Sequence, residues 1–156
     1  PAGVFLYCRG ARVRRTLAVE SGTRPMSATI SIVHPSDEER RLLVECMARE
    51  AAATSAYASA DALLRALEPG SRGSVIVPSD LPAPGTRSLI ETLRASHPGL
   101  RVVVLGRDGD LATAVACVRA GSVEYLAPPL SPRRLASVVR RALAPCPDPD
   151  RGAPVR

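Results

Sequence analysis

The sequence predicts an α/β protein in which five strands form one parallel sheet with helices on both faces. Two observations predict this class. Short apolar and β-branched runs alternate with amphipathic segments along most of the chain, which is typical of repeated strand–helix units. The third and fourth runs, residues 74–77 and 101–105, are almost continuously apolar, as strands buried on both faces are. We therefore expect these two strands at the centre of the sheet.

The other strands are shorter or less apolar. Residues 29–33 form the first strand, residues 54–57 a weak second strand, and residues 124–126 the fifth. Each interval between strands is long enough for a crossover helix, so neighbouring strands are expected to run parallel. Units of this kind predict the flavodoxin-like doubly wound sheet, with strand order 2-1-3-4-5, five helices and a functional crevice at the carboxyl ends of the strands.

Two helices have clear start signals. Ser36, followed three residues later by Glu39, predicts a capping box at the start of the first helix. Ser131 before Pro132 predicts the start of the last helix. The last helix also has an apolar stripe to lay on the sheet, formed by Leu135, Val138, Val139 and Ala142. Four arginines avoid that stripe, namely Arg133, Arg134, Arg140 and Arg141.

The two ends of the chain differ from its middle. Residues 1–25 hold five arginines and one acidic residue without sustained periodicity, so residues 1–26 are expected to be a disordered basic extension. A basic arm for nucleic acid is the alternative. Residues 145–156 are rich in proline and are expected to be a disordered tail. Residues 27–144 then form the folded domain.

The composition favours a cytoplasmic protein. Its 156 residues and 46% hydrophobic content suit one domain with a substantial core. The four cysteines are far apart and lack the paired spacing of a zinc site. No apolar run approaches the ~20 residues of a membrane helix, and no secretory segment is evident. We therefore expect no membrane association.

Two segments resemble the receiver domain of bacterial response regulators. Residues 32–37, IVHPSD, followed by RRLL at 40–43, are similar to an apolar strand that runs into an acidic pair and then a helix. Residues 114–130, AVACVRAGSVEYLAPPL, are similar to the receiver pattern of a helix, Ala-Gly-Ala, an aromatic–leucine pair and Lys-Pro-Phe. The resemblance covers residues 29–143 and implies a role in two-component phosphorelay signalling.

The resemblance also implies which positions carry the receiver's chemistry. The receiver's acidic pair falls on His34 and Pro35, and its phosphoacceptor aspartate falls on Pro78. Its hydroxyl residue falls on Gly106, and its lysine falls on Pro128. Mg²⁺ prefers oxygen ligands, which this pair does not offer. Proline has no side-chain heteroatom that could accept a phosphoryl group, and the chain contains no lysine at all.

These replacements predict a degenerate receiver that has lost phosphotransfer. We expect it to act through phosphorylation-independent protein contacts in signalling or transcription control, without bound Mg²⁺ or another cofactor. Enzymatic activity is not expected either. The sequence has no nucleophile–base pair, metal cluster or phosphate-binding glycine loop at useful spacing.

Three residues have alternative interpretations. Asp80, two residues beyond Pro78, could be a displaced acceptor, although a loop or capping carboxylate is the better reading. His34 could bind a softer metal, but no second histidine or cysteine is near it in the sequence. Tyr125 occupies the receiver's aromatic position and is either an interface residue or a core residue with its hydroxyl at the edge.

The expected partner is a protein: an output domain, a kinase, another regulator or a second copy. The resemblance implies contact through the fourth helix, the fifth strand and the last helix, where Arg119, Arg133 and Arg134 are placed. A small molecule or anion in the emptied crevice is the alternative function. Direct nucleic acid binding has little support, because the basic extension precedes the domain and no further helical module follows it.

Overall fold

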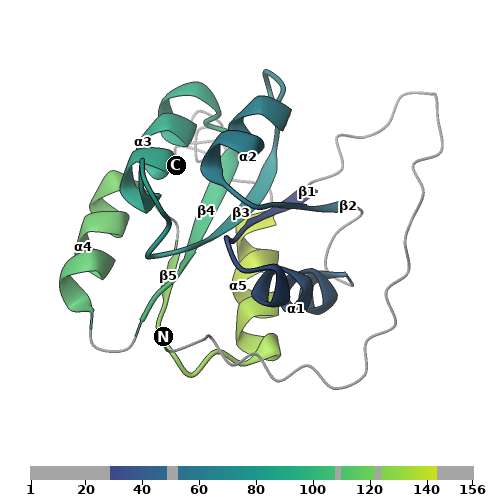
Figure 1. Cartoon of the computed structure of the whole chain (residues 1–156), viewed down its shortest axis with the longest axis vertical. Coiled ribbons are helices and arrows are strands. Elements are labelled where there is room, and N and C mark those ends of the chain that lie inside the picture. The colour runs from purple at the N-terminus through teal and green to yellow at the C-terminus, as the bar shows by residue number, and fades with distance from the viewer. Residues whose placement is uncertain (1–28, 49–52, 108–109, 122–123, 144–156) are drawn as a thin grey trace, which may run out of the picture.

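The computed structural model describes residues 29–48, 53–107, 110–121 and 124–143, which form a central sheet covered by helices on both faces (Figure 1). The elements in chain order are β1 (Thr29–Val33), α1 (Asp37–Met47), β2 (Ala53–Tyr57), α2 (Ala60–Ala66), β3 (Gly73–Pro78), α3 (Thr86–Ser96), β4 (Leu100–Leu105), α4 (Leu111–Ala120), β5 (Glu124–Leu126) and α5 (Pro132–Leu143). The five strands pair in parallel in the order β2-β1-β3-β4-β5. The predicted fold class and strand order are confirmed.

The strand bounds differ from the sequence-based expectation at β2, β3 and β4. Each of these strands begins one residue earlier, and β3 also extends through Pro78. At Gly73, a Cβ atom would lie 1.9 Å from the Thr29 carbonyl oxygen, and the residue has a φ of +141°. Only glycine fits at such a close backbone approach. Because a glycine carries no β-strand signal of its own, the side-chain pattern missed the start of β3.

The sheet separates two apolar cores. Helices α1 and α5 cover one face, and α2, α3 and α4 cover the other (Figure 1). Alternate residues along a strand point to opposite faces, so Ile76 joins the α1/α5 core whereas Val75 and Val77 join the other. Every residue of β3 is buried, and β3 lies in the middle of the sheet as predicted. β4 lies beside it as a second interior strand.

The last helix follows its sequence signals. The backbone N–H of Arg134 donates to the Ser131 hydroxyl at 3.1 Å, and Pro132 is the first helical residue. All four residues of the predicted apolar stripe are buried, and the four arginines are exposed. The Pro128–Pro129 peptide bond is cis. The predicted N-terminal extension and C-terminal tail lie outside the described residues.

Membrane-spanning helices and clusters of metal-binding side chains are both absent from the described residues. Within them, none of the helices is long and apolar enough to cross a membrane. In the same ranges, histidine, cysteine and acidic side chains do not gather in groups of three or more that could hold a metal ion.

Candidate functional site at the carboxyl ends of the strands

The site positions follow directly from the ends of three neighbouring strands. His34 comes after β1, Pro78 ends β3 and Gly106 comes after β4. Backbone hydrogen bonds continue the sheet through this region: the N–H of His34 donates to the Tyr57 carbonyl at 3.1 Å, and the N–H of Gly106 donates to the Leu126 carbonyl at 2.7 Å. The parallel sheet therefore brings these positions to one edge, as predicted.

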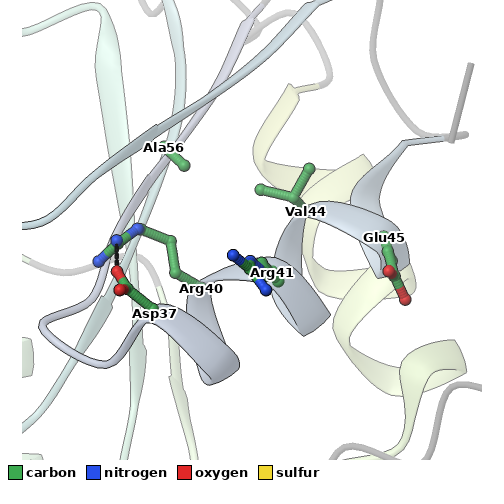
Figure 2. Close-up of a pocket in the computed structure, with 6 residues that line it drawn as sticks. All are labelled: Asp37, Arg40, Arg41, Val44, Glu45 and Ala56. Atoms are coloured by element: carbon green, nitrogen blue, oxygen red, sulfur yellow. Dashed lines mark hydrogen bonds and ion pairs between the residues drawn. The ribbon is translucent and has the colours of Figure 1, made fainter. Parts of the chain in front are cut away.

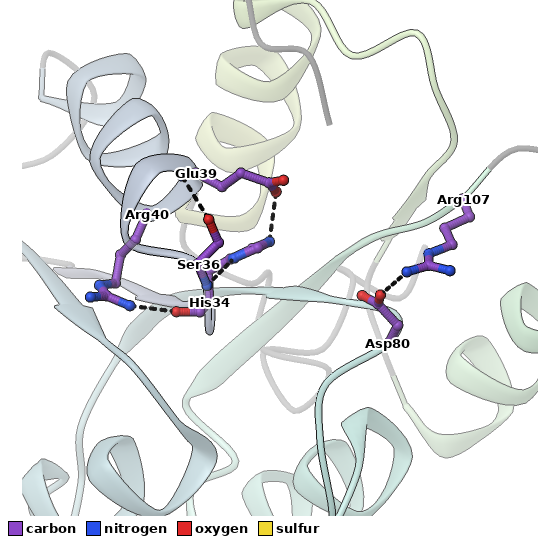
Figure 3. A network of polar contacts seen from close by, with 6 residues as sticks. All are labelled: His34, Ser36, Glu39, Arg40, Asp80 and Arg107. Carbon is purple, nitrogen blue, oxygen red and sulfur yellow. Dashed lines mark hydrogen bonds and ion pairs between the residues drawn. The ribbon is translucent and has the colours of Figure 1, made fainter. Parts of the chain in front are cut away.

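His34 is buried and has a partner on each ring nitrogen (Figure 3). The backbone N–H of Ser36 donates to Nδ1 at 3.1 Å, and Nε2 lies 2.8 Å from a Glu39 carboxylate oxygen. Because Nδ1 accepts a hydrogen bond, the ring proton belongs on Nε2, where it is donated to Glu39. Arg40 donates to the His34 carbonyl oxygen at 2.7 Å. These contacts suit a neutral imidazole.

The predicted capping box is half right. Ser36 is the N-cap of α1, and its hydroxyl accepts from the Glu39 N–H at 3.5 Å. In a complete box, the Glu39 carboxylate would accept from the Ser36 N–H. Here the Ser36 N–H donates to Nδ1 of His34, and the Glu39 carboxylate accepts from Nε2 of His34. The imidazole ring therefore lies between the Ser36 N–H and the Glu39 carboxylate. The sequence shows a histidine two residues before Ser36, but capping rules alone do not predict this insertion.

The pKa of His34 is lowered from its ordinary value, and burial of the ring is the main cause. The carboxylates of Glu39 and Asp80 oppose this shift, while the Arg40 guanidinium adds to it. Burial disfavours the charged imidazolium, because a charge loses its hydration in the protein interior. His34 is therefore neutral at physiological pH. It supplies neither the negative charge of the receiver's carboxylates nor the positive charge of its lysine.

Pro78 is buried at the end of β3, and its carbonyl accepts a hydrogen bond from the Thr86 hydroxyl at 2.6 Å. This bond links the strand end to the first residue of α3. Asp80 lies farther along the same loop, with 49% of its side chain exposed, and forms an ion pair with Arg107 (Figure 3). Asp80 is therefore paired with a guanidinium that comes from the segment after β4.

Gly106 and Tyr125 fit together as a pair. A Cβ atom added at Gly106 would lie 2.1 Å from Cε1 and Cζ of the Tyr125 ring and 2.2 Å from its hydroxyl oxygen. Real side-chain atoms do not approach so closely, so the ring occupies the space that a side chain at position 106 would fill. The Tyr125 hydroxyl is buried without a hydrogen-bond partner in the described part of the chain. Of the two interpretations of Tyr125, one placed it in the core with its hydroxyl at the edge; the ring packs against the core, but the hydroxyl is buried. The contact with Gly106 was not predicted.

The remaining predicted positions add no charged group to this edge. Pro35 lies in the loop between β1 and α1, is exposed, and is followed by the N-cap Ser36. Pro128 lies in the loop between β5 and α5. The carbonyl of its neighbour Ala127 accepts a hydrogen bond from Arg134 at 3.3 Å. An arginine thus approaches this loop from α5.

Three grooves lie elsewhere on the surface. One of about 300 Å³ opens between α1 and β2 (Figure 2). Its lining is Asp37, Arg40, Arg41, Val44, Glu45 and Ala56. In it, Arg40 forms an ion pair with Asp37. Two others, of about 420 and 450 Å³, lie between α3 and α4. None of these three grooves is lined by the five site positions.

Comparison with known proteins identifies relatives of the same fold. The chain is 30% identical over 117 residues to the DNA-binding transcriptional regulator NtrC of Azospirillum brasilense, covering 75% of this chain and 24% of that protein. It is 25% identical over 119 residues to the transcriptional regulatory protein FixJ of Azorhizobium caulinodans, covering 76% of this chain and 56% of that protein. The chain thus spans about a quarter and about half of these two relatives. No protein-family model matches it.

Solved structures agree with these relatives. NtrX from Brucella abortus is 28% identical with a TM-score of 0.68, over 76% of this chain and 27% of that one. A response regulator receiver domain protein from Clostridium thermocellum is 19% identical with a TM-score of 0.67, over 74% of this chain and 94% of that one. The second match covers nearly the whole of that solved chain and shows that the two share a fold.

Proposed function

We propose that the chain, which contains a response-regulator receiver domain of two-component signalling, is a pseudo-receiver that acts through protein contacts and does not accept phosphate. The observation that carries this proposal is the state of the crevice at the strand ends. Pro78 occupies the acceptor position, and the Tyr125 ring fills the space beside Gly106. Pro78 offers no nucleophile at the acceptor position, and Gly106 offers no hydroxyl.

The polar groups that remain at this edge are paired with one another. His34 is neutral and bound to Ser36 and Glu39, and Asp80 forms an ion pair with Arg107. Mg²⁺ is usually held by one or two carboxylates together with water, and the positions of the receiver's acidic pair hold His34 and Pro35. We therefore propose that the protein binds no Mg²⁺ here and has no phosphotransfer activity.

This pairing of the polar groups weakens the alternative function, which is binding of a small molecule or anion in the crevice. An anion at the strand ends would meet a neutral His34 and would have to compete with Asp80 for Arg107. The partner that we propose is instead a protein, met on the face of α4, β5 and α5, and the location that we propose is the cytoplasm. Nucleic acid is not part of the proposal.

Treatment with Mg²⁺ and acetyl phosphate tests the loss of phosphotransfer. The intact mass of the protein should not change, and its amide NMR spectrum should be the same with and without the phosphodonor. A receiver with an intact acidic pair, acceptor and lysine, treated in parallel, shows that the reagent is active. Formation of an acyl phosphate on this chain, at Asp80 or elsewhere, would overturn the proposal.

A further inference from the structure

Helix α4 has an apolar side that the rest of the described fold leaves uncovered. Its three largest apolar side chains, Leu111, Val115 and Val118, are exposed to 75%, 41% and 55%. They are spaced four and three residues apart, so they form one stripe along the helix. The opposite side of α4 is buried through Cys117 and Ala120. A helix that is apolar on both sides is typical of a buried position, which indicates that something covers this stripe.

The surface beside the stripe is a groove with positively charged walls. Helices α3 and α4 pack side by side (Figure 1), and a groove of about 450 Å³ opens between them near their carboxyl-terminal ends. Arg94 and Arg119 line it from the two helices, together with Glu91. That glutamate already forms an ion pair with Arg87, at 3.0 Å. The lining of the groove therefore holds two guanidinium groups and one carboxylate, and that carboxylate is already paired with Arg87.

Arg94 is also close to the end of α4. Its side chain lies over Gly121, where a Cβ atom would come within 2.9 Å of the Arg94 Cδ. Gly121 is the left-handed C-cap of α4. The positive charge is thus next to the last turn of the helix that carries the stripe, and Arg119 directly follows Val118 in the same helix.

The described fold also carries more positive charge in its second part than in its first. In residues 29–48 and 53–107, eight arginines are matched by eight acidic residues. In residues 110–121 and 124–143, five arginines stand against two acidic residues. Four of these five arginines lie on α5, and Arg119 lies on α4. The excess attracts acidic partners in general, and the groove with Arg94 and Arg119 is what locates the contact at α3 and α4.

We propose that the α3–α4 surface, defined as the stripe Leu111, Val115 and Val118 with Arg94 and Arg119, binds a partner helix that has acidic residues beside an apolar face. The apolar side chains of the partner cover the stripe, and a carboxylate enters the groove between the two arginines. This inference rests on the proposed function, because it names the chemistry of a protein contact by which the pseudo-receiver acts. It shares α4 with the face of α4, β5 and α5 proposed above and extends from α4 to α3.

A second copy of the chain fits this surface less well. Two copies related by a two-fold axis would present the same patch to each other, and each would bring the positively charged groove without a surplus of carboxylates. The stripe is also short, because a helix of 10 residues is only ~15 Å long. A standard stable interface buries ~800 Å² on each partner, which is more than one side of so short a helix provides. A transient contact with an acidic helix suits this size better.

The test uses two synthetic amphipathic peptides and the full chain. Both peptides carry leucine at helical spacing along one face; one has glutamate beside that face, and the other has lysine at the same positions. Titration is followed by amide NMR. The glutamate peptide should shift the amides of Val115, Val118 and Arg119 and of the last turn of α3, and the lysine peptide should not. Shifts confined to other surfaces would overturn the proposal.

Paired variants separate the specific surface from general charge attraction. Arg94→Glu/Arg119→Glu should weaken binding of the glutamate peptide by roughly tenfold or more. The control Arg41→Glu/Arg65→Glu changes the net charge equally at two exposed arginines of α1 and α2, which lie outside the surface, and it should bind like the unaltered chain. Equal weakening in both variants would show nonspecific attraction and defeat the proposal.

Sedimentation distinguishes the other occupant of the stripe. A concentration-dependent dimer that Leu111→Ser/Val118→Ser converts to a monomer would show that a second copy covers the stripe, and would also overturn the proposal. The outcome is independent of phosphotransfer: an acyl phosphate formed in the earlier experiment refutes the pseudo-receiver whether or not the peptide binds, and loss of peptide binding alone refutes only this surface.

Discussion

At the scale of single residues, His34 couples the start of α1 to proton binding. Its Nδ1 accepts from the Ser36 N–H, so protonation would set two N–H groups against each other. Burial lowers its folded-state pKa, so the unfolded chain binds the proton more readily. The stabilisation is present above the ordinary pKa of 6.5 and is lost as pH falls through the folded-state pKa.

The prediction from this coupling concerns acid stability. Between about pH 7.5 and 5.5, the urea midpoint of the unaltered chain should fall more than that of His34→Gln, which cannot titrate in this range. Glu39, Asp80 and Arg40 influence the ring and stay present in both proteins, so the difference isolates the imidazole. Parallel pH profiles for the two proteins would contradict the assignment.

Gly106 and Tyr125 give a second residue-scale prediction. Gly106→Ser introduces a Cβ that would lie 2.1 Å from the ring, so the ring must leave its place. We expect a loss of roughly 1–3 kcal/mol in the free energy of unfolding, as in other overpacked sites, and a shift of the Tyr125 ring signals in NMR.

A double variant provides the control for this contact. When Tyr125→Ala has already removed the ring, adding Gly106→Ser should cost little more, because nothing remains to collide with the new side chain. Strictly additive losses of stability would show that the serine acts through some other contact.

At the scale of elements, the cap of α5 is the clearest case. Ser131→Ala removes the hydroxyl that accepts from the Arg134 N–H and should lower the free energy of unfolding by about 1 kcal/mol. Ser137→Ala is the matched control, because Ser137 is exposed within the same helix and alanine has the higher helix propensity. Urea unfolding of both variants measures the difference; equal effects would contradict the capping role.

The sequence predicted elements better than contacts. Alternating apolar runs placed all five strands, and the serine–proline pair placed the start of α5. The pattern missed the ends of β3, because Gly73 is selected by a close backbone approach and Pro78 is a residue that strands rarely contain. It also missed the Tyr125 ring beside Gly106, since such a fit depends on how the segment after β4 lies against the neighbouring strand β5.

At the scale of the whole molecule, phosphotransfer requires several groups together, and replacing one should not restore it. Pro78→Asp alone should remain unmodified by Mg²⁺ and acetyl phosphate, because the metal ligands and the lysine are still missing. Adding His34→Asp, Pro35→Asp and Pro128→Lys to it should permit an acyl phosphate, detected by intact mass. Modification of the single variant would show that fewer groups suffice than we propose.

The Tyr125 ring beside Gly106 also bears on how a cell could use this protein. Under our proposal no phosphoryl group moves this ring from its place beside Gly106, and the domain would signal through the number of its copies. That number follows the rates of synthesis and degradation, so the response would change more slowly than one set by a covalent mark.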